Sequence, residues 1–297
     1  MSATGCEACA SGFAAGLVDG VRQSADSGRL PRVKLVWLEL AGCSGNIISL
    51  LDGNNPDFAF LATQMSWIVF ENSLMVRDGE QAMEQLFSVL GSDYILVVEG
   101  AVSTNTAGYY NVIGTYQGRR ISGYEAVKAL GEAASHVIAM GTCASDGGVS
   151  AARPDPSGCV SVQAVLGRRV IKLPGCSCNP DWLTGTLAHL LLYGEPELDT
   201  LDRPVMFYAA TIHDRCPRRS YFDAGIFATR LGEETCTFRL GCRGPVTRAD
   251  CPIRRWNERV NWPVGDNATC IGCAQFGFPD LMEPFVSFDT AGGEGRR

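Results

Sequence analysis

The sequence lacks the features that mark several common classes of protein. It has only three histidines, no long run of charge of one sign and no stretch of about 18 consecutive apolar residues, so no transmembrane helix is expected. No Walker loop, dinucleotide fingerprint or HExxH motif occurs, which leaves nucleotide chemistry and zinc peptidase activity without support. The net charge of −7 argues against a nucleic-acid partner, because such proteins normally carry a basic face.

The two ends of the chain also lack recognisable signals. Residues 1–30 show no basic start followed by an apolar run, and the arginine pairs lie outside the region where a twin-arginine signal would stand. We therefore expect a cytoplasmic protein, associated with a membrane only through a partner. Because both segments are rich in small residues, we expect residues 1–30 and 289–297 to be mobile.

Cysteine, by contrast, is abundant. Thirteen cysteines are more than a chain of this length needs for packing, so they must be cross-links, metal ligands or redox groups. In a reducing cytoplasm, clustered cysteines bind metal more often than they form disulfides.

Strand-like apolar runs alternate with helical patterns in the first two-thirds of the chain. Strands are predicted at residues 33–40, 94–99, 136–140, 170–173 and 205–209, and helices through residue 51 and at residues 81–90, 123–134 and 181–193. This alternation predicts an α/β fold, with a flavodoxin-like parallel sheet domain over residues 31–210. A small, loop-rich C-terminal domain is predicted to follow over residues 211–288, held together by its metal sites.

Three cysteines follow predicted strands directly. In a parallel α/β sheet, functional groups collect at the carboxyl ends of the strands. Cys43, Cys143 and Cys176 are therefore expected to meet on one edge of the sheet.

Seven further candidate ligands lie in the C-terminal part. They are His213, Cys216, Cys236, Cys242, Cys251, Cys270 and Cys273. Thiolates bind iron-sulfur clusters or zinc, and an imidazole can replace one thiolate. Seven ligands make one site of four and one of three; the site of three fits zinc poorly, because structural zinc takes four ligands, and fits a 3Fe-4S cluster well.

Five stretches then resemble a known family. They are GTCASDGG (141–148), PGCSCNP (174–180), HDRCPRRSYFDAG (213–225), LGCRGPVTRADCPIRRWN (240–257) and WPVGDNATCIGC (262–273). In ligand type and in spacing they are similar to the small subunits of nickel-iron hydrogenases, over about residues 33–285.

The resemblance implies a ligand set for each of three iron-sulfur clusters. The proximal cluster would be held by Cys43, Cys143 and Cys176, the medial cluster by Cys251, Cys270 and Cys273, and the distal cluster by His213, Cys216, Cys236 and Cys242. The medial cluster would be 3Fe-4S and the distal one 4Fe-4S or 3Fe-4S.

The resemblance also implies a function and a partner. The chain would relay electrons from hydrogen oxidation to an acceptor protein or a quinone pathway, beside a large subunit that carries the nickel-iron centre. Because no export signal and no membrane helix are visible, the chain looks most like the small subunit of a cytosolic uptake or high-affinity hydrogenase. The heterodimers are expected to form a higher-order oligomer.

One position departs from the family pattern. Where the family has Cys-x-x-Cys after the first strand, this chain has Cys43-Ser44-Gly45-Asn46. A neutral amide is a poor iron ligand beside thiolates, so we expect a 3Fe-4S proximal cluster with the Asn46 side chain pointing at its empty corner.

Other readings remain open at this stage. Cys178 is an alternative proximal ligand, whereas Cys6, Cys9 and Cys159 have no assigned role. His136 and His189 are expected to be packing or surface residues, and Glu39 and Glu99 solvated or interface carboxylates near the proximal site. Alternative functions are a hydrogen sensor with the same clusters, a structural zinc protein, and a complex I type subunit, which would share only the N-terminal cluster region.

Overall fold

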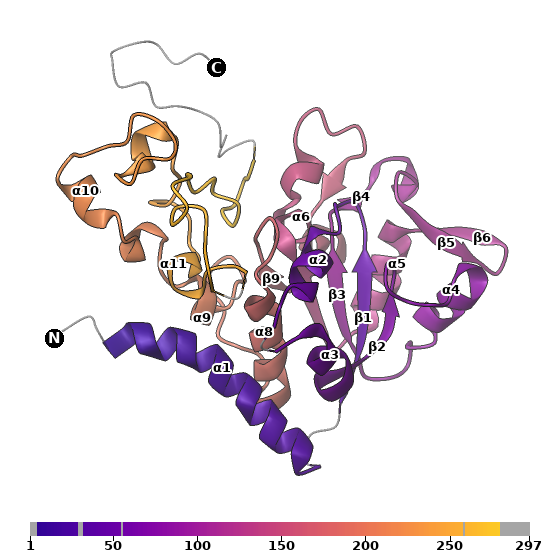
Figure 1. Cartoon of the computed structure of the whole chain (residues 1–297). Helices are drawn as coiled ribbons and strands as arrows, with labels where there is room; N and C mark the ends of the chain where they lie inside the picture. Colours follow the sequence, from indigo (N-terminus) through magenta and orange to yellow (C-terminus); the bar gives the residue numbers. More distant parts are fainter. Residues whose placement is uncertain (1–4, 29–31, 55, 258, 280–297) are drawn as a thin grey trace. The chain divides into compact units, whose positions relative to one another are not determined.

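A computed structural model describes residues 5–28, 32–54, 56–257 and 259–279, with side chains from residue 16 onward. Contacts divide the chain into two compact units (Figure 1). The first unit is Gly12–Val205, and the second comprises Met206 onward together with the first residues of the chain. The expectations for the tail, residues 289–297, and for the side chains of Cys6 and Cys9 fall outside the described part.

A five-stranded parallel sheet forms the centre of the first unit. Its strands stand in the order β2-β1-β3-β7-β9, with all neighbouring pairs parallel. Their bounds are Ser66–Glu71 for β2, Val33–Glu39 for β1, Ile95–Glu99 for β3, His136–Met140 for β7 and Ile171–Leu173 for β9. This is the flavodoxin-like order, in which the strand order reverses between β1 and β3. The predicted fold class is confirmed.

Helices pack on both faces of this sheet (Figure 1). On one face, buried side chains of β1 and β3 such as Val36 and Leu96 form a core with Met83 of α4 (Gly79–Phe87) and Leu130 of α5 (Gly123–Ala133). On α8 (Pro180–Tyr193), Trp182, Leu183 and Leu187 are buried as well. Helix α5 begins with a capping box between Ser122 and Glu125, which satisfies backbone groups at its first turn.

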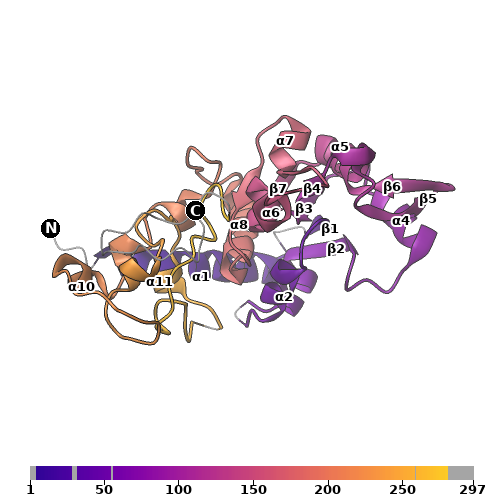
Figure 2. The same ribbon diagram turned by 90° about the horizontal axis from the view of Figure 1, so that it is seen from above.

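The remaining elements of this unit are short. They are α2 (Gly45–Leu51), α3 (Phe58–Phe60), η1 (Leu61–Met65), β4 (Val102–Ser103), η2 (Asn105–Gly108), β5 (Val112–Tyr116), β6 (Arg119–Ser122), α6 (Gly141–Asp146), η3 (Gly148–Ala151), β8 (Cys159–Val160) and α7 (Val162–Leu166). The β5–β6 hairpin packs beside α4 and extends away from the sheet (Figure 2).

Three elements differ from the sequence-based expectation. The start of the chain forms a long helix, α1 (Gly5–Asp26), in place of a mobile segment. Leu17, Val18 and Val21 are buried on this helix. Their helical spacing was not recognised in the sequence because small residues surround them. Strand β2 was missed. The predicted strand at residues 205–209 is wrong, because Val205–Tyr208 is a short helix, α9; periodicity cannot distinguish a short apolar run in a strand from one in a buried helix.

From Met206 onward, the described residues of the second unit form short helical turns joined by loops. Besides α9 they are η4 (His213–Arg215), α10 (Arg219–Asp223), η5 (Thr237–Leu240) and α11 (Cys251–Arg254). A buried ion pair joins Arg254 to Asp250, with 2.7 Å between nitrogen and oxygen, and the Arg254 guanidinium lies over the Phe207 ring. In the described parts of the chain, no helix has the length and apolar character needed to span a membrane.

Candidate metal-cluster sites

The carboxyl edge of the sheet carries three of the predicted ligands. Cys43 follows β1, Cys143 lies in α6 directly after β7, and Cys176 follows β9. Cys43 and Cys176 are exposed and Cys143 is half-buried. The Ser150 hydroxyl links two of the segments, because it lies 2.6 Å from the Ala41 carbonyl oxygen and 3.6 Å from Cys143 Sγ.

Two glycines leave room for these thiols. A Cβ on Gly45 would lie 3.0 Å from Cys43 Sγ and 3.7 Å from Ser177 Cβ, so the Cys43 loop borders the segment of Cys176. A Cβ on Gly148, whose φ is +53°, would lie 2.8 Å from the Cys143 nitrogen and 3.0 Å from its Sγ. Any side chain at Gly148 would therefore collide with the backbone that positions Cys143.

The Asn46 side chain does not point at an empty cluster corner, as the sequence had suggested. Its Nδ2 donates to Glu99 Oε1 at 3.0 Å and lies 3.4 Å from the Met140 carbonyl oxygen, and its Oδ1 accepts from the Cys178 backbone N–H at 2.7 Å. The side chain is buried. Both ends of the amide are thus used in tying together the carboxyl ends of β3 and β7 and the loop after β9.

Glu99 has a structural role in this loop. Besides the Asn46 side chain, its carboxylate accepts the backbone N–H groups of Asn46 and Ile47 at 2.8 and 3.1 Å. These groups lie in the first turn of α2, where a carboxylate is favoured. Burial nevertheless raises the pKa of Glu99, although the donated hydrogen bonds oppose that shift. Glu99 is therefore a buried support of the Cys43 loop.

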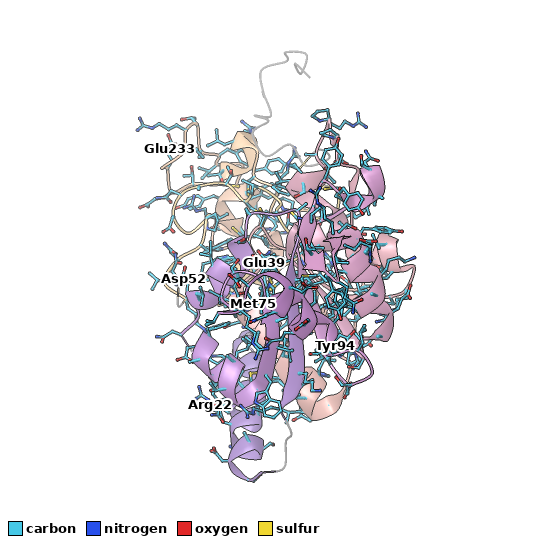
Figure 3. All side chains as sticks on the ribbon, turned by 90° about the vertical axis from the view of Figure 1, so that its right-hand side faces the viewer. Arg22, Glu39, Asp52, Met75, Tyr94 and Glu233 are labelled. Atoms are coloured by element: carbon cyan, nitrogen blue, oxygen red, sulfur yellow. The ribbon has the colours of Figure 1, made fainter. Side chains whose placement is uncertain are left out.

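A second pair of carboxyl groups lies at the same edge. Glu39 ends β1 and Glu71 ends β2, and Glu39 lies close enough to help raise the pKa of the Glu71 carboxyl. Glu39 Oε1 and Glu71 Oε1 are buried and have no hydrogen-bond partner among the described residues. Glu39 also accepts from Ser44, beside Cys43, at 3.2 Å. In Figure 3, Glu39 marks this end of the sheet and Tyr94 the opposite end.

Burial, followed by the nearby Glu39, raises the pKa of Glu71 from 4.5 to about 7 against two opposing backbone hydrogen bonds. The stability contributed by neutral Glu71 is then fully present below the unfolded pKa and is lost as the pH rises through about 7. We expect Glu71→Gln, which stays neutral, to stabilise the heterodimer at about pH 8 by on the order of 2 kcal/mol and to add little at about pH 5. Apparent Tm values against pH would measure this, with Glu84→Gln, at an exposed position of α4, as the control; a gain that does not depend on pH would contradict the raised pKa of Glu71.

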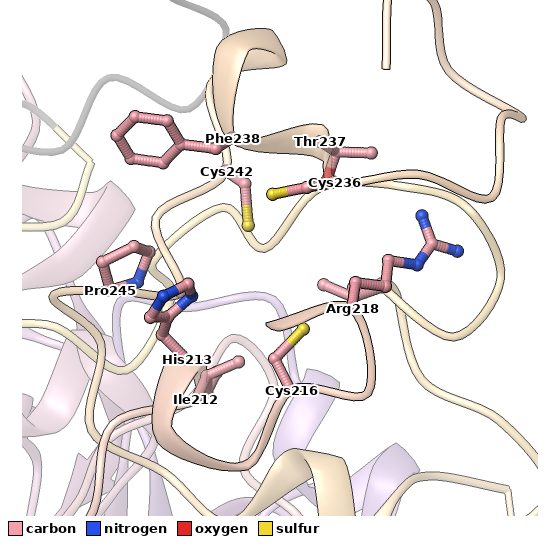
Figure 4. A pocket seen from close by; sticks show the side chains of 11 residues that line it. Ile212, His213, Cys216, Arg218, Cys236, Thr237, Phe238, Cys242 and Pro245 are labelled. Carbon is pink, nitrogen blue, oxygen red and sulfur yellow. The ribbon is translucent and has the colours of Figure 1, made fainter. Parts of the chain in front are cut away.

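The second unit has a pocket lined by four of the predicted ligands (Figure 4). His213, Cys216, Cys236 and Cys242 line it together with apolar side chains, among them Ile212, Pro245 and Val264. His213 is the first residue of the turn η4. Cys236 directly precedes the turn η5. The loops thus bring together residues that are up to 29 positions apart in the sequence.

The electrostatics of this pocket suit a soft metal centre. Burial is the largest cause that raises the pKa of Cys216 and of Cys236, and Cys242 raises both further. Burial also lowers the pKa of His213, with a contribution from Arg219, so the imidazole stays neutral, as a ligand must be. Crowded buried thiols can ionise only beside a cation, and metal binding supplies one.

The remaining three ligands form a second group. Burial raises the pKa of Cys251, which is fully enclosed, and that of Cys270 to about 12, and Cys273 raises both further. The Trp256 side chain hydrogen-bonds to the Cys251 sulfur and opposes the rise of its pKa. Hydrogen bonds to sulfur are one of the means by which a protein sets the potential of an iron-sulfur cluster.

The donor types in the pocket of the second unit suit a soft metal centre. His213, Cys216, Cys236 and Cys242 line it together, and thiolates with an imidazole are ligands both of iron-sulfur clusters and of structural zinc.

The other described cysteines and histidines have local partners of their own. The buried Cys178 thiol donates to the Asn179 carbonyl oxygen at 3.5 Å, and Cys159 lies 3.2 Å from the Ser157 hydroxyl. His189 Nδ1 lies 2.8 Å from the Gly194 carbonyl oxygen, and His136 is 4.0 Å from Glu195. These contacts give the histidines local structural partners.

Comparison with known proteins finds the same two parts. Residues 208–286 match the C-terminal domain of NiFe/NiFeSe hydrogenase small subunits, and residues 43–190 match the 20 kDa subunit of NADH ubiquinone oxidoreductase. The periplasmic [NiFeSe] hydrogenase small subunit of Desulfomicrobium baculatum is 32% identical over 274 residues, 86% of this chain and 87% of the relative.

Solved structures agree. The nickel-iron-selenium hydrogenase of Desulfomicrobium baculatum in a reduced, active form superposes with a TM-score of 0.81 at 33% identity, over 86% of this chain and 98% of that one. The actinobacterial-type NiFe-hydrogenase of Ralstonia eutropha H16 also gives 0.81, at 28% identity over 90% and 87% of the two chains.

The chain has a parallel sheet with thiols at its carboxyl edge, followed by a domain with a pocket lined by thiols and an imidazole. These features define the class of iron-sulfur electron-transfer proteins. The chain belongs to the family of nickel-iron hydrogenase small subunits. Its role is electron transfer within a hydrogenase heterodimer whose catalytic centre lies on the large subunit. The zinc-protein alternative is thereby wrong, and the complex I alternative fails because the hydrogenase-specific C-terminal domain is present.

Proposed function

We propose that this chain relays electrons from hydrogen oxidation on the large subunit to an external acceptor, through three iron-sulfur clusters. Cys43, Cys143 and Cys176 would hold the proximal cluster. The medial cluster would take Cys251, Cys270 and Cys273, and the distal cluster His213, Cys216, Cys236 and Cys242. The observation that carries the proposal is the pocket in which one imidazole and three thiols converge in a chain of this family.

Clusters bound in these sites supply one-electron transfer, and the protein sets their potentials. Backbone N–H groups bond to the sulfurs of Cys216, Cys236 and Cys270, which stabilises the more negative, reduced form. The buried Arg218 guanidinium adds a fixed positive charge near Cys216 and Cys236. These side chains and amides favour uptake of an electron at the distal and medial sites.

The proximal site is proposed to be 3Fe-4S. It offers three thiolates, and the fourth family position, Asn46, is held by Glu99 and by the Cys178 N–H. One thiolate fewer makes the cluster less negative and easier to reduce, which suits the oxidation of hydrogen. The medial cluster is proposed as 3Fe-4S and the distal one as 4Fe-4S or 3Fe-4S.

The setting of the enzyme is part of the proposal. We place it in the cytoplasm as an uptake hydrogenase, although the Desulfomicrobium relative is periplasmic; clustered cysteines that bind metal are typical of a reducing compartment. The domains would be 31–210 and 211–288, and the heterodimers would form a larger oligomer. A hydrogen sensor with the same clusters is the alternative, and steady turnover with an acceptor would exclude it.

Metal analysis of the purified heterodimer tests the cluster assignment. We expect about ten iron and about twelve acid-labile sulfide in this chain, from two 3Fe-4S clusters and one 4Fe-4S cluster. Electron paramagnetic resonance of the oxidised protein should show two 3Fe-4S signals. Zinc in place of iron, or a four-iron proximal centre bound by Asn46 or Cys178, would contradict the assignment.

A further inference from the structure

An aromatic cluster connects His213 with the surface of the second unit. The His213 ring meets the Phe222 ring edge-on, with 4.5 Å between centroids. Phe222 in turn meets Phe238 at 5.2 Å and Phe227 at 6.0 Å. Figure 4 shows His213 and Phe238 on the same side of the pocket. These rings form one packed path that starts at the candidate distal ligand.

Arginines and apolar side chains cover the outside of this cluster. The exposed Arg239 guanidinium lies 4.4 Å from the centroid of the Phe227 ring. Tyr221 and Ile226 are 37% and 49% exposed, and their backbones are joined by a hydrogen bond. Arg219, on the same short helix as Phe222, is exposed beside His213 and forms an ion pair with the exposed Asp223, with 3.0 Å between nitrogen and oxygen. We call Arg219, Tyr221, Ile226 and Arg239 the arginine face.

The charge of the chain is divided unequally. Residues 206–279 contain ten arginines, no lysine and seven acidic residues, a formal charge of +3, whereas residues 1–205 contain thirteen basic and twenty-one acidic residues, a charge of −8. The part that holds the distal site is therefore basic within an acidic chain. Such a surface attracts a negatively charged partner and repels a positively charged one.

We propose that the arginine face docks a small acidic electron-transfer protein, which receives electrons from the distal site. This inference rests on the proposed function of that site. Arginine and aromatic side chains are the groups that most often anchor protein interfaces. Weak electron-transfer encounters bury little area and depend on charge for their rate, which fits a small face that carries the exposed Arg239 in the basic part of the chain.

The transfer is balanced without bond changes. In each encounter one electron leaves the distal site, which is oxidised, and enters the metal or flavin centre of the partner, which is reduced. Oxidation of one hydrogen molecule on the large subunit supplies electrons for two such encounters and releases both protons there.

The test uses the heterodimer under hydrogen with two forms of one acceptor. Mitochondrial cytochrome c is basic, and succinylation converts its lysines to carboxylates while it keeps the same fold and haem. We expect the succinylated form to be reduced about tenfold faster in kcat/KM at low ionic strength, with the difference vanishing at high salt. Faster reduction of the native, basic form would overturn the proposal.

A charge-reversal pair locates the face. Arg239→Glu should lower kcat/KM for succinylated cytochrome c about five- to tenfold and leave reduction of a small neutral dye unchanged. Arg120→Glu, the same change at an exposed position of β6, is the matched control and should have little effect. Equal effects of the two variants would sink the docking face. Loss of hydrogen-driven dye reduction in the wild type would instead refute the proposed function.

Discussion

Replacing Cys143 with serine should break electron transfer out of the heterodimer while leaving hydrogen activation intact. Cys143 lies in the first turn after β7, where its backbone nitrogen and sulfur lie against Gly148. Hydrogen-driven reduction of an acceptor should fall by more than about 100-fold, since even the loss of an outer partner of a metal ligand costs 10–100-fold. Hydrogen–deuterium exchange, which needs only the large subunit's centre, should persist.

Cys159→Ser is the matched control. Cys159 is another cysteine of the first unit, buried, with its sulfur beside the Ser157 hydroxyl, and it belongs to none of the proposed ligand sets. Its replacement should preserve acceptor reduction and the proximal signal in electron paramagnetic resonance. If Cys143→Ser kept both, or if it abolished exchange as well, the division of labour between this chain and the large subunit would be wrong.

Asn46→Ala should destabilise the proximal site strongly. The change removes the hydrogen bonds of the amide to Glu99 and to the Cys178 N–H and leaves two buried groups short of a partner. Unsatisfied buried groups cost about 1–3 kcal/mol each, so we expect a loss of about 2–4 kcal/mol in the free energy of unfolding. The proximal signal should broaden or disappear, because the Cys43 and Cys178 loops lose their common anchor.

Asn72→Ala provides the comparison for that variant. Asn72 is another asparagine at the same edge of the sheet, where its Oδ1 accepts from the Glu39 backbone N–H at 3.1 Å. It is tied to neither Glu99 nor Cys178 by a described bond, so its loss should cost about 1 kcal/mol and leave the proximal signal sharp. Similar spectra for the two variants would show that Asn46 is not the anchor inferred from the structure.

The sequence predicted the parts of this protein that depend on local patterns. The apolar run at β1 and the small residues after it identified a strand that ends at Cys43, and the parallel sheet places Cys143 and Cys176 at the same edge. The ligand spacing in the C-terminal part was informative because Cys270 and Cys273 stand only three positions apart.

Long-range partners could not be predicted in the same way. Asn46 bonds to residues 53 and 132 positions away, and a single sequence offers no signal for such pairs, so its side chain was assigned the wrong direction. The Glu39–Glu71 pair was missed because β2 was missed. The helix α1 was missed as well. Its buried residues Leu17, Val18 and Val21 have helical spacing, but alanines and glycines around them make the apolar pattern weak.

Electron paramagnetic resonance under hydrogen tests the central claim most directly. The oxidised heterodimer should show the cluster signals of this chain, and hydrogen gas should remove or change them by reduction. The same chain purified without the large subunit should keep its oxidised signals under hydrogen, because it has no site that activates the gas. Reduction of the isolated chain by hydrogen, or clusters in the heterodimer that hydrogen leaves oxidised, would contradict the account.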